Sequence, residues 1–407
     1  MNTVLNMPRF LLDDARAVRD PYPVYRRLRA YGPVCRGGPG QWVFPRHEEV
    51  SALLRDPRLG REFPEEYQAV SVGEGPANDY LRRIVVDRDR PDHTRLRRLL
   101  TKSLSPAMIR GLREPIALLV DGLLDQFAEE RRFDLVRDLA VPVPMMVMSE
   151  LLDIPRADRD DIARLSTSLA QAFAVFISED KRREAHGAVV ELREYMAGLV
   201  RERRRRPGED LLSRMLTAVK DGEEPLTDEE IIDNALFVYY AGFETTTNAI
   251  ATGGDLLVHQ PHTQRQLRAD PGIVGSALEE FMRYDAPIHA TTRLAVEPIE
   301  IAGLTVRKGR VVVLLLASAN HDERVFHDPA RADLTRSPNP HLSFGGGIHH
   351  CLGAALARVE GAVVFERLAA RFADIESAGE GVWEPSEGGF RFPYWAHRSL
   401  PVAVRPA

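Results

Sequence analysis

Cysteine is scarce in this sequence: Cys35 and Cys351 are the only two among 407 residues. Two cysteines are too few for a disulfide framework, and they lack the clustered spacing of a structural zinc site. Each of them therefore needs its own explanation. Cys35 has neither a glycine-rich approach nor a motif after it, and we interpret it as an ordinary structural residue.

Long hydrophobic runs are absent as well. A membrane-spanning helix needs roughly 18 consecutive apolar residues, and no such stretch occurs. Met1–Asp20 mixes charged residues with short apolar stretches, which is not the pattern of a signal peptide. We therefore expect a cytoplasmic protein with no membrane anchor.

An overall basic charge is also lacking, since the formal net charge is −6. This argues against nucleic acid as the main partner. Gly/Ser linkers, low-complexity tracts and internal repeats are not visible either. The chain is 44% hydrophobic and 28% charged, a globular composition that allows a core large enough to enclose a cofactor. We expect residues 1–407 to form one domain.

The pattern of apolar residues is mostly helical. Strand-like patterns occur near three short segments, Gln41–Phe44, Ile299–Val306 and Val311–Leu316. The sequence therefore predicts a mainly α fold with small β-sheets.

The longest predicted helix begins at Thr227, whose hydroxyl forms a capping-box pattern with Glu230. The segment His259-Gln260-Pro261 ends it, because proline disfavours helical backbone at the residue before it. At about 1.5 Å per residue, about thirty residues give a rod roughly 50 Å long. Its many apolar residues indicate that it is buried.

The centre of this helix, Ala241-Gly242-Phe243-Glu244-Thr245, contains residues that weaken helices. Glycine costs about 1 kcal/mol relative to alanine, and a threonine hydroxyl can bond back to a carbonyl of the preceding turn. One interpretation is a tolerated irregularity. The other is a ligand groove, in which the acid Glu244 beside the Thr245 hydroxyl passes protons to a molecule lying against the helix.

A glycine-rich segment, Phe344-Gly345-Gly346-Gly347-Ile348-His349-His350-Cys351-Leu352-Gly353, leads into a further helical pattern. Glycines permit positive φ and close backbone approach, so that amides can point at the sulfur of Cys351. The start of a helix also lowers the pKa of a thiol. The segment therefore suits a thiolate.

Two other interpretations of this loop are a phosphate-binding loop and the active site of a cysteine hydrolase. A phosphate-binding loop would need the Gly-x-Gly-x-x-Gly frame or a Walker lysine, and the segment has neither. A cysteine hydrolase would need an activating histidine, for which His349 and His350 are candidates, although adjacent residues seldom face each other.

Residues 344–353 match Phe-Gly-x-Gly-x-His-x-Cys-x-Gly, which resembles the haem-binding pattern of the cytochrome P450 superfamily. Three further motifs occur in the family's order: His-x-x-x-Arg at 93–97, Ala-Gly-x-Glu-Thr at 241–245 and Glu-x-x-Arg at 280–283. The resemblance extends from Asp20-Pro21-Tyr22-Pro23 to Arg398-Ser399-Leu400-Pro401 and is to the soluble bacterial branch.

The resemblance implies the cytochrome P450 fold, with haem b between the long central helix and the cysteine loop. Cys351 is then the axial thiolate ligand of the iron. Glu-x-x-Arg, usually an exposed helical ion pair when isolated, becomes a buried pair with Arg331 as its third member. The resemblance implies that the haem propionates are bound by His93, Arg97, Arg293 and His349. It implies further contacts with the cofactor at Ala241, Gly242, Phe344 and Gly353.

The family's activity is that of a monooxygenase, which uses O2 and electrons from external partners, here ferredoxin and ferredoxin reductase. Glu244 is implied as the solvent-linked acid, and Thr245 as the hydroxyl that supports oxygen activation. We expect hydroxylation or epoxidation of an apolar small molecule in secondary metabolism, such as antibiotic biosynthesis. The alternatives are oxidative coupling or rearrangement without oxygen insertion, and haem binding without catalysis.

Several segments occupy positions that line the substrate pocket in relatives, although they suit an ordinary core equally well. They are Val72–Val86, Gln171–Ile177 with Phe173 and Phe176, Phe237, Ile288–Thr292, and Phe392–Trp395.

Two basic stretches complete the expectations. Arg201–Arg206 is predicted to be a solvated helix end that the helix dipole favours. A second set is either ordinary surface or a docking site for an acidic redox protein. It consists of Arg82, Arg83, Arg95, Arg98 and Lys102.

Overall fold

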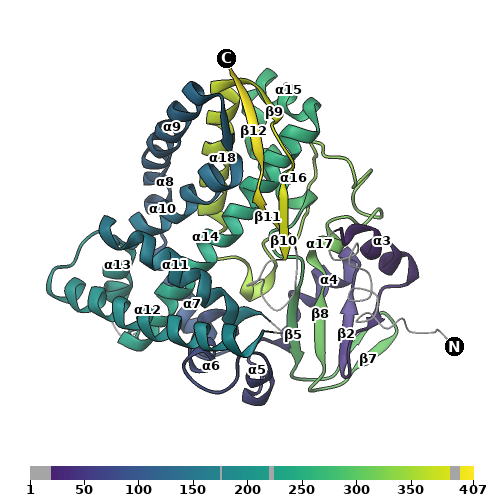
Figure 1. The fold of residues 1–407 in the computed structure, drawn as a ribbon. Coiled ribbons are helices and arrows are strands. Elements are labelled where there is room, and N and C mark those ends of the chain that lie inside the picture. Colours follow the sequence, from purple (N-terminus) through teal and green to yellow (C-terminus); the bar gives the residue numbers. More distant parts are fainter. Residues whose placement is uncertain (1–19, 175–176, 220–223, 386–394) are drawn as a thin grey trace.

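The computed structural model describes residues 20–174, 177–219, 224–385 and 395–407. Helices dominate, and Figure 1 shows β2, β5 and β8 together at the lower right, beside α3 and α4. The helices are α3 (Tyr22–Tyr31), α4 (His47–Leu53), α5 (Glu65–Val72), α6 (Pro76–Leu81), α7 (Asp92–Ser103), α8 (Pro106–Gly111), α9 (Arg113–Glu130), α10 (Pro142–Leu151), α11 (Arg159–Ala170), α12 (Glu179–Arg205), α13 (Leu211–Thr217), α14 (Asp228–His259), α15 (Pro261–Ala269), α16 (Val274–Tyr284), α17 (Leu316–Ala319) and α18 (Ala354–Arg371).

Helix α14 is the long central helix that the sequence predicts. Both hydrogen bonds of the capping box are present, between the Thr227 hydroxyl and the Glu230 amide and between the Glu230 carboxylate and the Thr227 amide. The helix ends at His259, before Gln260 and Pro261. It packs against α10, α12, α16 and α18. The predicted start, end and burial of this helix are therefore confirmed.

The largest sheet has the strand order β1-β2-β8-β5-β3, and β2 and β8 pair in parallel while its other pairs are antiparallel. A small sheet, β4-β12-β9, lies near the C-terminus (Figure 1). The strands are β1 (Cys35–Arg36), β2 (Gln41–Phe44), β3 (Leu59–Gly60), β4 (Arg132–Asp134), β5 (Thr291–Ala295), β6 (Ile299–Ile301), β7 (Leu304–Val306), β8 (Val311–Leu314), β9 (Phe372–Ser377), β10 (Val382–Pro385), β11 (Trp395–Ser399) and β12 (Pro401–Pro406).

The strand-like segment Ile299–Val306 is two strands rather than one. Ala302 and Gly303 both have positive φ, at 52° and 73°, and they join β6 to β7 as a two-residue hairpin loop. Positive φ at both loop positions is the geometry that matches the twist of an antiparallel pair. The predicted strand Val311–Leu316 ends at Leu314, because Leu316 begins α17.

Cys35 is fully buried on β1 and packs in an apolar cluster with Val43, Tyr25 and Leu28. Burial raises the pKa of its thiol to about 11. These observations fit an unreactive structural cysteine. Among the residues that the structure describes, no helix has the length and apolarity required to span a membrane.

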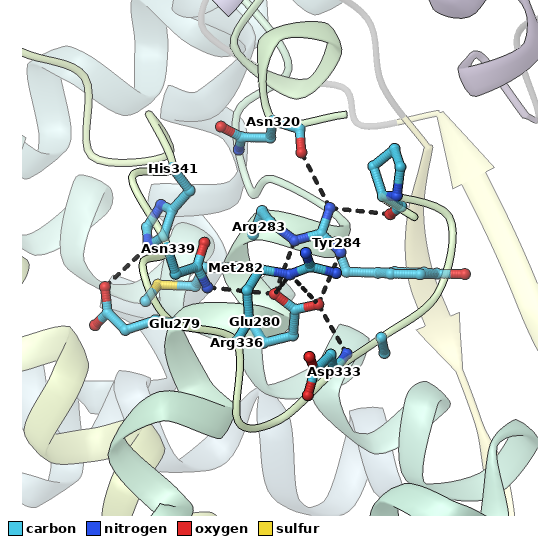
Figure 2. A network of polar contacts seen from close by, with 12 residues as sticks. Glu279, Glu280, Met282, Arg283, Tyr284, Asn320, Asp333, Arg336, Asn339 and His341 are labelled. Carbon is cyan, nitrogen blue, oxygen red and sulfur yellow. Dashed lines mark hydrogen bonds and ion pairs between the residues drawn. The ribbon is translucent and has the colours of Figure 1, made fainter. Parts of the chain in front are cut away.

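Glu280 and Arg283 form a buried ion pair on α16, and both side chains are 0% exposed. The Arg283 guanidinium also donates to the carbonyls of Asn320 and Pro329. Figure 2 shows Asn339, Asp333 and Arg336 converging on the Glu280 carboxylate. The pair that the sequence predicts as buried is therefore buried, and it ties α16 to the loop that precedes the cysteine segment.

The third member of this network is Arg336, whose Nε lies 3.0 Å from Glu280 Oε2. The prediction that Arg331 supplies this guanidinium is wrong. Arg331 is exposed and contributes its backbone carbonyl, which accepts from Arg336 and Arg283. The chain turns at Asp328, which has a positive φ of 45°. Beyond this turn, residue 336 rather than residue 331 faces Glu280.

Candidate functional site

A cavity of about 230 Å³ lies between the centre of α14 and the glycine-rich cysteine loop. Helices α7, α10 and α18, the loop before β5 and the start of β5 also contribute to its wall. All nine residues that the sequence assigns to the cofactor border it: His93, Arg97, Ala241, Gly242, Arg293, Phe344, His349, Cys351 and Gly353. The structure thus brings together residues as far apart in the chain as His93 and Gly353, which 260 positions separate.

The cysteine loop is shaped by two glycines in the left-handed region. Gly345 and Gly347 both have a φ of 66°, which side-chain-bearing residues rarely adopt. A Cβ at Gly347 would also stand 2.4 Å from the Leu54 carbonyl oxygen, so this position has no room for a side chain. The Cys351 amide donates to the Phe344 carbonyl across 2.9 Å and closes the loop.

The Cys351 thiol is exposed toward the cavity that it borders. The protein packed around the sulfur raises its pKa above the ordinary value. The amides of Gly353 and Ala354 donate to the sulfur and lower the pKa of the thiol. The guanidinium groups of Arg97 and Arg358 lower it as well. Donors are therefore in place for a thiolate, and a cation bound at the sulfur would complete its stabilisation.

Elsewhere the cavity wall carries three guanidinium groups and two imidazoles, those of Arg61, Arg97, Arg293, His93 and His349. The rings of His93 and His349 are 4.3 Å apart, and His93 Nδ1 and His349 Nε2 are buried without a partner in the described structure. Burial, followed by neighbouring arginines, lowers the pKa of His93 to about 4 and that of His349 further still. Burial also lowers the pKa of Arg97. Such a cluster calls for an anionic ligand.

Arg61 belongs to this cluster although no sequence motif marks it. Its side chain borders the cavity and pairs with the buried carboxylate of Asp87 across 2.8 Å. Its Nη1 donates to Thr291 Oγ1 and to the Thr292 carbonyl. The sequence gives no signal for this role, because Arg61 reaches the site through the pairing of β3 with β5.

The donor set fits haem. A soft thiolate borders one part of the cavity, as a ligand for iron, and hydrogen-bond donors and cations border another, as partners for carboxylates. The two orphaned imidazole nitrogens are the kind of buried polar atom that a bound group satisfies. The roles of the individual residues remain predictions.

On the α14 side, Ala241, Gly242 and Thr245 border the cavity. The Thr245 hydroxyl donates to the Ala241 carbonyl across 2.8 Å, as the sequence predicts for a threonine in this position. A Cβ at Gly242 would lie 2.5 Å from Met148 Sδ, so the glycine admits α10 to close contact. Glu244 is half-buried and stands outside the described cavity wall.

The predicted substrate-contacting segments divide into three groups. Val85, Val86, Phe237, Ile288 and Thr291 border the cavity. Phe173 is an ordinary core residue, because its ring stacks on Tyr240 at 4.8 Å. Phe176 and Phe392 lie outside the described residues. Further apolar wall residues, which the sequence did not single out, are Leu104, Met148, Leu151, Val238 and Leu316.

Glu360 on α18 also borders the cavity. Its side chain is 1% exposed, and its Oε2 has no hydrogen-bond partner among the described residues. Burial raises the pKa of this carboxyl to about 8. Glu360 is therefore mainly protonated at neutral pH, and no sequence motif singles it out.

Several arginines of the two basic stretches form ion pairs with acidic side chains, and one of them is buried. Arg82, Arg83 and Arg95 pair with Glu65, Asp233 and Glu230, respectively. The prediction that Arg201–Arg206 is a solvated helix end is wrong for Arg203. That side chain is buried and pairs with Asp153 and Asp210, because the chain turns back after α12 and brings the N-cap of α13 against it.

Comparisons with known proteins agree with this geometry. A family model described as Cytochrome P450 matches residues 58–389. The chain is 36% identical to the cytochrome P450 monooxygenase PikC of Streptomyces venezuelae, covering 90% of this chain and 88% of PikC. It is 32% identical to the polyketide biosynthesis cytochrome P450 PksS of Bacillus subtilis, covering 88% of each.

The solved structures include P450BioI in complex with an acyl carrier protein ligated to hexadec-9Z-enoic acid. It superposes with a TM-score of 0.88 at 32% identity, over 96% of this chain and 100% of that one. The expected fold, mainly helical with small sheets, is confirmed. The chain belongs to the cytochrome P450 family and is a monooxygenase of that family.

Proposed function

We propose that the cavity holds haem b with Cys351 as the axial ligand, and that His93, Arg97, Arg293 and His349 bind its propionates. The observation that carries this proposal is the convergence of the Cys351 thiol and these donors on one cavity. Arg61 supports the same anionic groups, since it borders the cavity beside Arg293.

The reaction that we propose is hydroxylation or epoxidation of an apolar organic substrate. When bound, the haem supplies the activation of O2 with two electrons. Thr245 offers a hydroxyl at the cavity wall, held by the Ala241 carbonyl. Glu244, on the same turn of α14 but outside the wall, is positioned to carry protons from the solvent side toward Thr245.

The substrate class follows from the wall. Val85, Phe237, Val238, Leu151 and Ile288 present apolar surface, which favours a medium-to-large apolar molecule. PksS is named for polyketide biosynthesis, and P450BioI was solved with a fatty acyl group on a carrier protein. We propose an intermediate of secondary metabolism, such as a polyketide or peptide in antibiotic biosynthesis.

Electrons reach this enzyme, in our proposal, from ferredoxin and ferredoxin reductase in the cytoplasm. Arg98 and Lys102 lie on α7, the helix that also carries His93 and Arg97 of the cavity wall. A basic surface there suits an acidic redox protein, because opposite charges speed and orient docking.

The cofactor assignment is tested by the spectrum of the reduced, CO-treated protein. Wild type and Cys35→Ala are expected to show the long-wavelength band of thiolate-ligated haem, and Cys351→Ser is expected to lose it. Retention of that band by Cys351→Ser would mean that another group is the ligand.

The reaction is tested by titrating candidate metabolites and recording the low-to-high-spin absorbance shift. Those that bind are then incubated with ferredoxin, its reductase and NAD(P)H. A product heavier than its substrate by one oxygen atom supports hydroxylation or epoxidation. A coupled or rearranged product of unchanged oxygen content would favour the alternative reaction.

A further inference from the structure

The loop between α16 and β5, residues 285–290, presents two side chains to the cavity. Pro287 and Ile288 both border it, and Thr291 follows at the start of β5. The residues on either side of this pair, Asp285 and His289, bind each other, with His289 Nε2 3.1 Å from Asp285 Oδ1. The loop is thus an arch whose two ends are tied together.

Two tyrosines from α3 bind the same two residues. The Tyr22 hydroxyl lies 2.5 Å from Asp285 Oδ1, and the Tyr25 hydroxyl lies 3.2 Å from His289 Nδ1. Tyr25 is 1% exposed and His289 is 3% exposed. More than 260 residues separate each tyrosine from its partner. The arch is therefore fixed from behind by a distant helix.

The charge of Asp285 fixes the direction of the two hydrogen bonds that it receives. Burial alone would raise the pKa of Asp285, but hydrogen bonds and charge from His289 and the Tyr22 hydroxyl hold it below the ordinary value. The carboxylate is then an acceptor, so the Tyr22 hydroxyl and His289 Nε2 both donate to Asp285 Oδ1, and the Tyr25 hydroxyl pairs with His289 Nδ1.

Further contacts hold both ends of the arch. The Ala317 amide donates to the His289 carbonyl across 3.1 Å, and His321 Nε2 lies 2.7 Å from the Tyr284 carbonyl. Pro287 has no amide hydrogen, and the side chains of Pro287 and Ile288 offer only apolar surface. Ile288 also packs against the apolar cluster of β5, β8 and α17, and the anchors on each side hold the backbone that carries both side chains.

We propose that Tyr22, Tyr25, Asp285 and His289 form a clamp that positions Pro287 and Ile288 in the cavity and so determines the size of apolar ligand that the enzyme accepts. These four are positioning residues, since they act through the two side chains that face the ligand. The inference rests on the proposed placement of haem and substrate in this cavity.

The test uses two probes that bind haem iron through an azole nitrogen, imidazole and 4-phenylimidazole. Their dissociation constants are measured by absorbance on the haem-loaded full chain. Imidazole is small and serves as the internal reference, whereas the phenyl group must fit against the cavity wall. The ratio of the two constants reports the shape of the wall independently of turnover.

Asp285→Ala removes the acceptor shared by Tyr22 and His289. We expect it to change the ratio roughly five-fold or more, since one methylene-sized change in an apolar pocket alters discrimination by 10-fold or more. Asp210→Ala is the matched control. It removes another buried carboxylate, which accepts from Arg203 and the Ser213 amide and does not border the cavity. Asp210→Ala should lower the melting temperature and leave the ratio unchanged.

A double-mutant cycle isolates the route through Ile288. If the clamp acts by placing this side chain, Asp285→Ala should change the ratio far less in an Ile288→Ala background than in wild type. Tyr25→Phe removes one hydroxyl and keeps the ring, and it serves if Asp285→Ala does not fold. We expect Tyr25→Phe to change the ratio about two-fold, the effect of one neutral hydrogen bond at the lower end of its range.

An unchanged ratio in the folded variants, with normal CO spectra, would overturn the clamp and leave the proposed function intact. Equal changes in Asp285→Ala and Asp210→Ala would also overturn it, because the effect would then be general destabilisation. If wild type gave no azole spectrum at all, the haem assignment would fail first, and the inference with it.

Discussion

Arg61 and Arg293 point their Nη1 atoms at the same two oxygens, Thr291 Oγ1 and the Thr292 carbonyl. Two like charges are thereby held together in the interior, where Arg61 is 5% and Arg293 is 4% exposed. Burial, followed by the charge of Arg61, lowers the pKa of Arg293 to about 9. Asp87 balances one of the two charges, and the propionates of haem would balance the other.

Arg61→Gln should therefore weaken haem retention. A charge-assisted hydrogen bond contributes about 1.5–3 kcal/mol, so we expect haem to transfer to apomyoglobin roughly ten-fold faster or more. Arg203→Gln is the control, because it breaks a buried pair with Asp210 outside the cavity wall. Equal transfer rates in the two variants would remove Arg61 from the haem site.

Thr245→Ala should keep haem but uncouple electron use from product formation. The hydroxyl at the cavity wall is lost, so proton delivery is no longer controlled and reduced oxygen escapes as peroxide. The peroxide released per NAD(P)H consumed is expected to rise several-fold. Thr252→Ala, farther along α14 and away from the cavity wall, should couple like wild type. Unchanged coupling in Thr245→Ala would contradict the role assigned to its hydroxyl.

Arg336→Gln should destabilise the fold far more than Arg331→Gln. Glu280 is fully buried and keeps Arg283 as its ion-pair partner, so losing the charge-assisted hydrogen bonds from Arg336 should cost about 1.5–3 kcal/mol. Arg331 is exposed and contributes its backbone to the network, so its side-chain change should stay within about 0.5 kcal/mol. Denaturant unfolding of both variants checks the difference. A larger loss of stability in Arg331→Gln than in Arg336→Gln would instead support Arg331 as the partner of Glu280.

Glu360→Gln should alter the dependence of stability on pH. The pKa of Glu360 rises from 4.5 to about 8 on folding, because burial penalises the charged carboxylate. Between these two values the folded protein binds the proton more tightly than the unfolded chain does. The contribution of Glu360 to stability is therefore fully present below about pH 4.5 and is lost as the pH rises toward 8.

Glutamine carries no such penalty. Relative to wild type, Glu360→Gln should gain about 2–4 kcal/mol of stability between pH 5 and pH 8.5, since each unit of pKa shift corresponds to about 1.4 kcal/mol and water entry relieves part of it. Melting temperatures of both proteins at the two pH values measure this gain. A constant difference between the proteins would show that the carboxyl does not titrate in this range.

Charge reversal at Arg98 and Lys102 should raise the KM for ferredoxin several-fold at low salt. The increase should shrink as salt is added, because mobile ions screen exposed charges beyond about 10 Å at 0.1 M. Arg307→Glu with Lys308→Glu, on the exposed turn between β7 and β8, is the matched control. The same KM in both double variants would place the docking surface elsewhere.

The cysteine loop and the central helix were predictable because residues close together in the sequence determine their structure. Gly345, Gly347 and Cys351 stand within seven positions of each other, and both φ values came out positive as the glycines indicated. Thr227, Glu230 and Pro261 likewise mark the ends of α14 by local rules of capping. Family motifs then supplied the distant members of the site.

Arg336 and Arg61 were missed for a shared physical reason. Each acts through contacts between segments that local pattern does not specify: a turn at Asp328 in one case, and strand pairing in the other. The close contact of Gly242 with Met148 is similar, since it depends on how two helices cross. These contacts between distant segments depend on tertiary packing, which cannot be inferred from the local pattern of a single sequence.

The position of β12 has a consequence for the order in which this chain is assembled during synthesis. This strand, Pro401–Pro406, lies between β4 and β9 in its sheet although it is the last of the three in the chain. Its partner β4 is made some 270 residues earlier, as Pro401 pairs with Asp134. Residues 132–134 therefore cannot complete their sheet pairing until residues 401–406 have been synthesised, and we expect a chain truncated before residue 401 to aggregate more readily than the full chain.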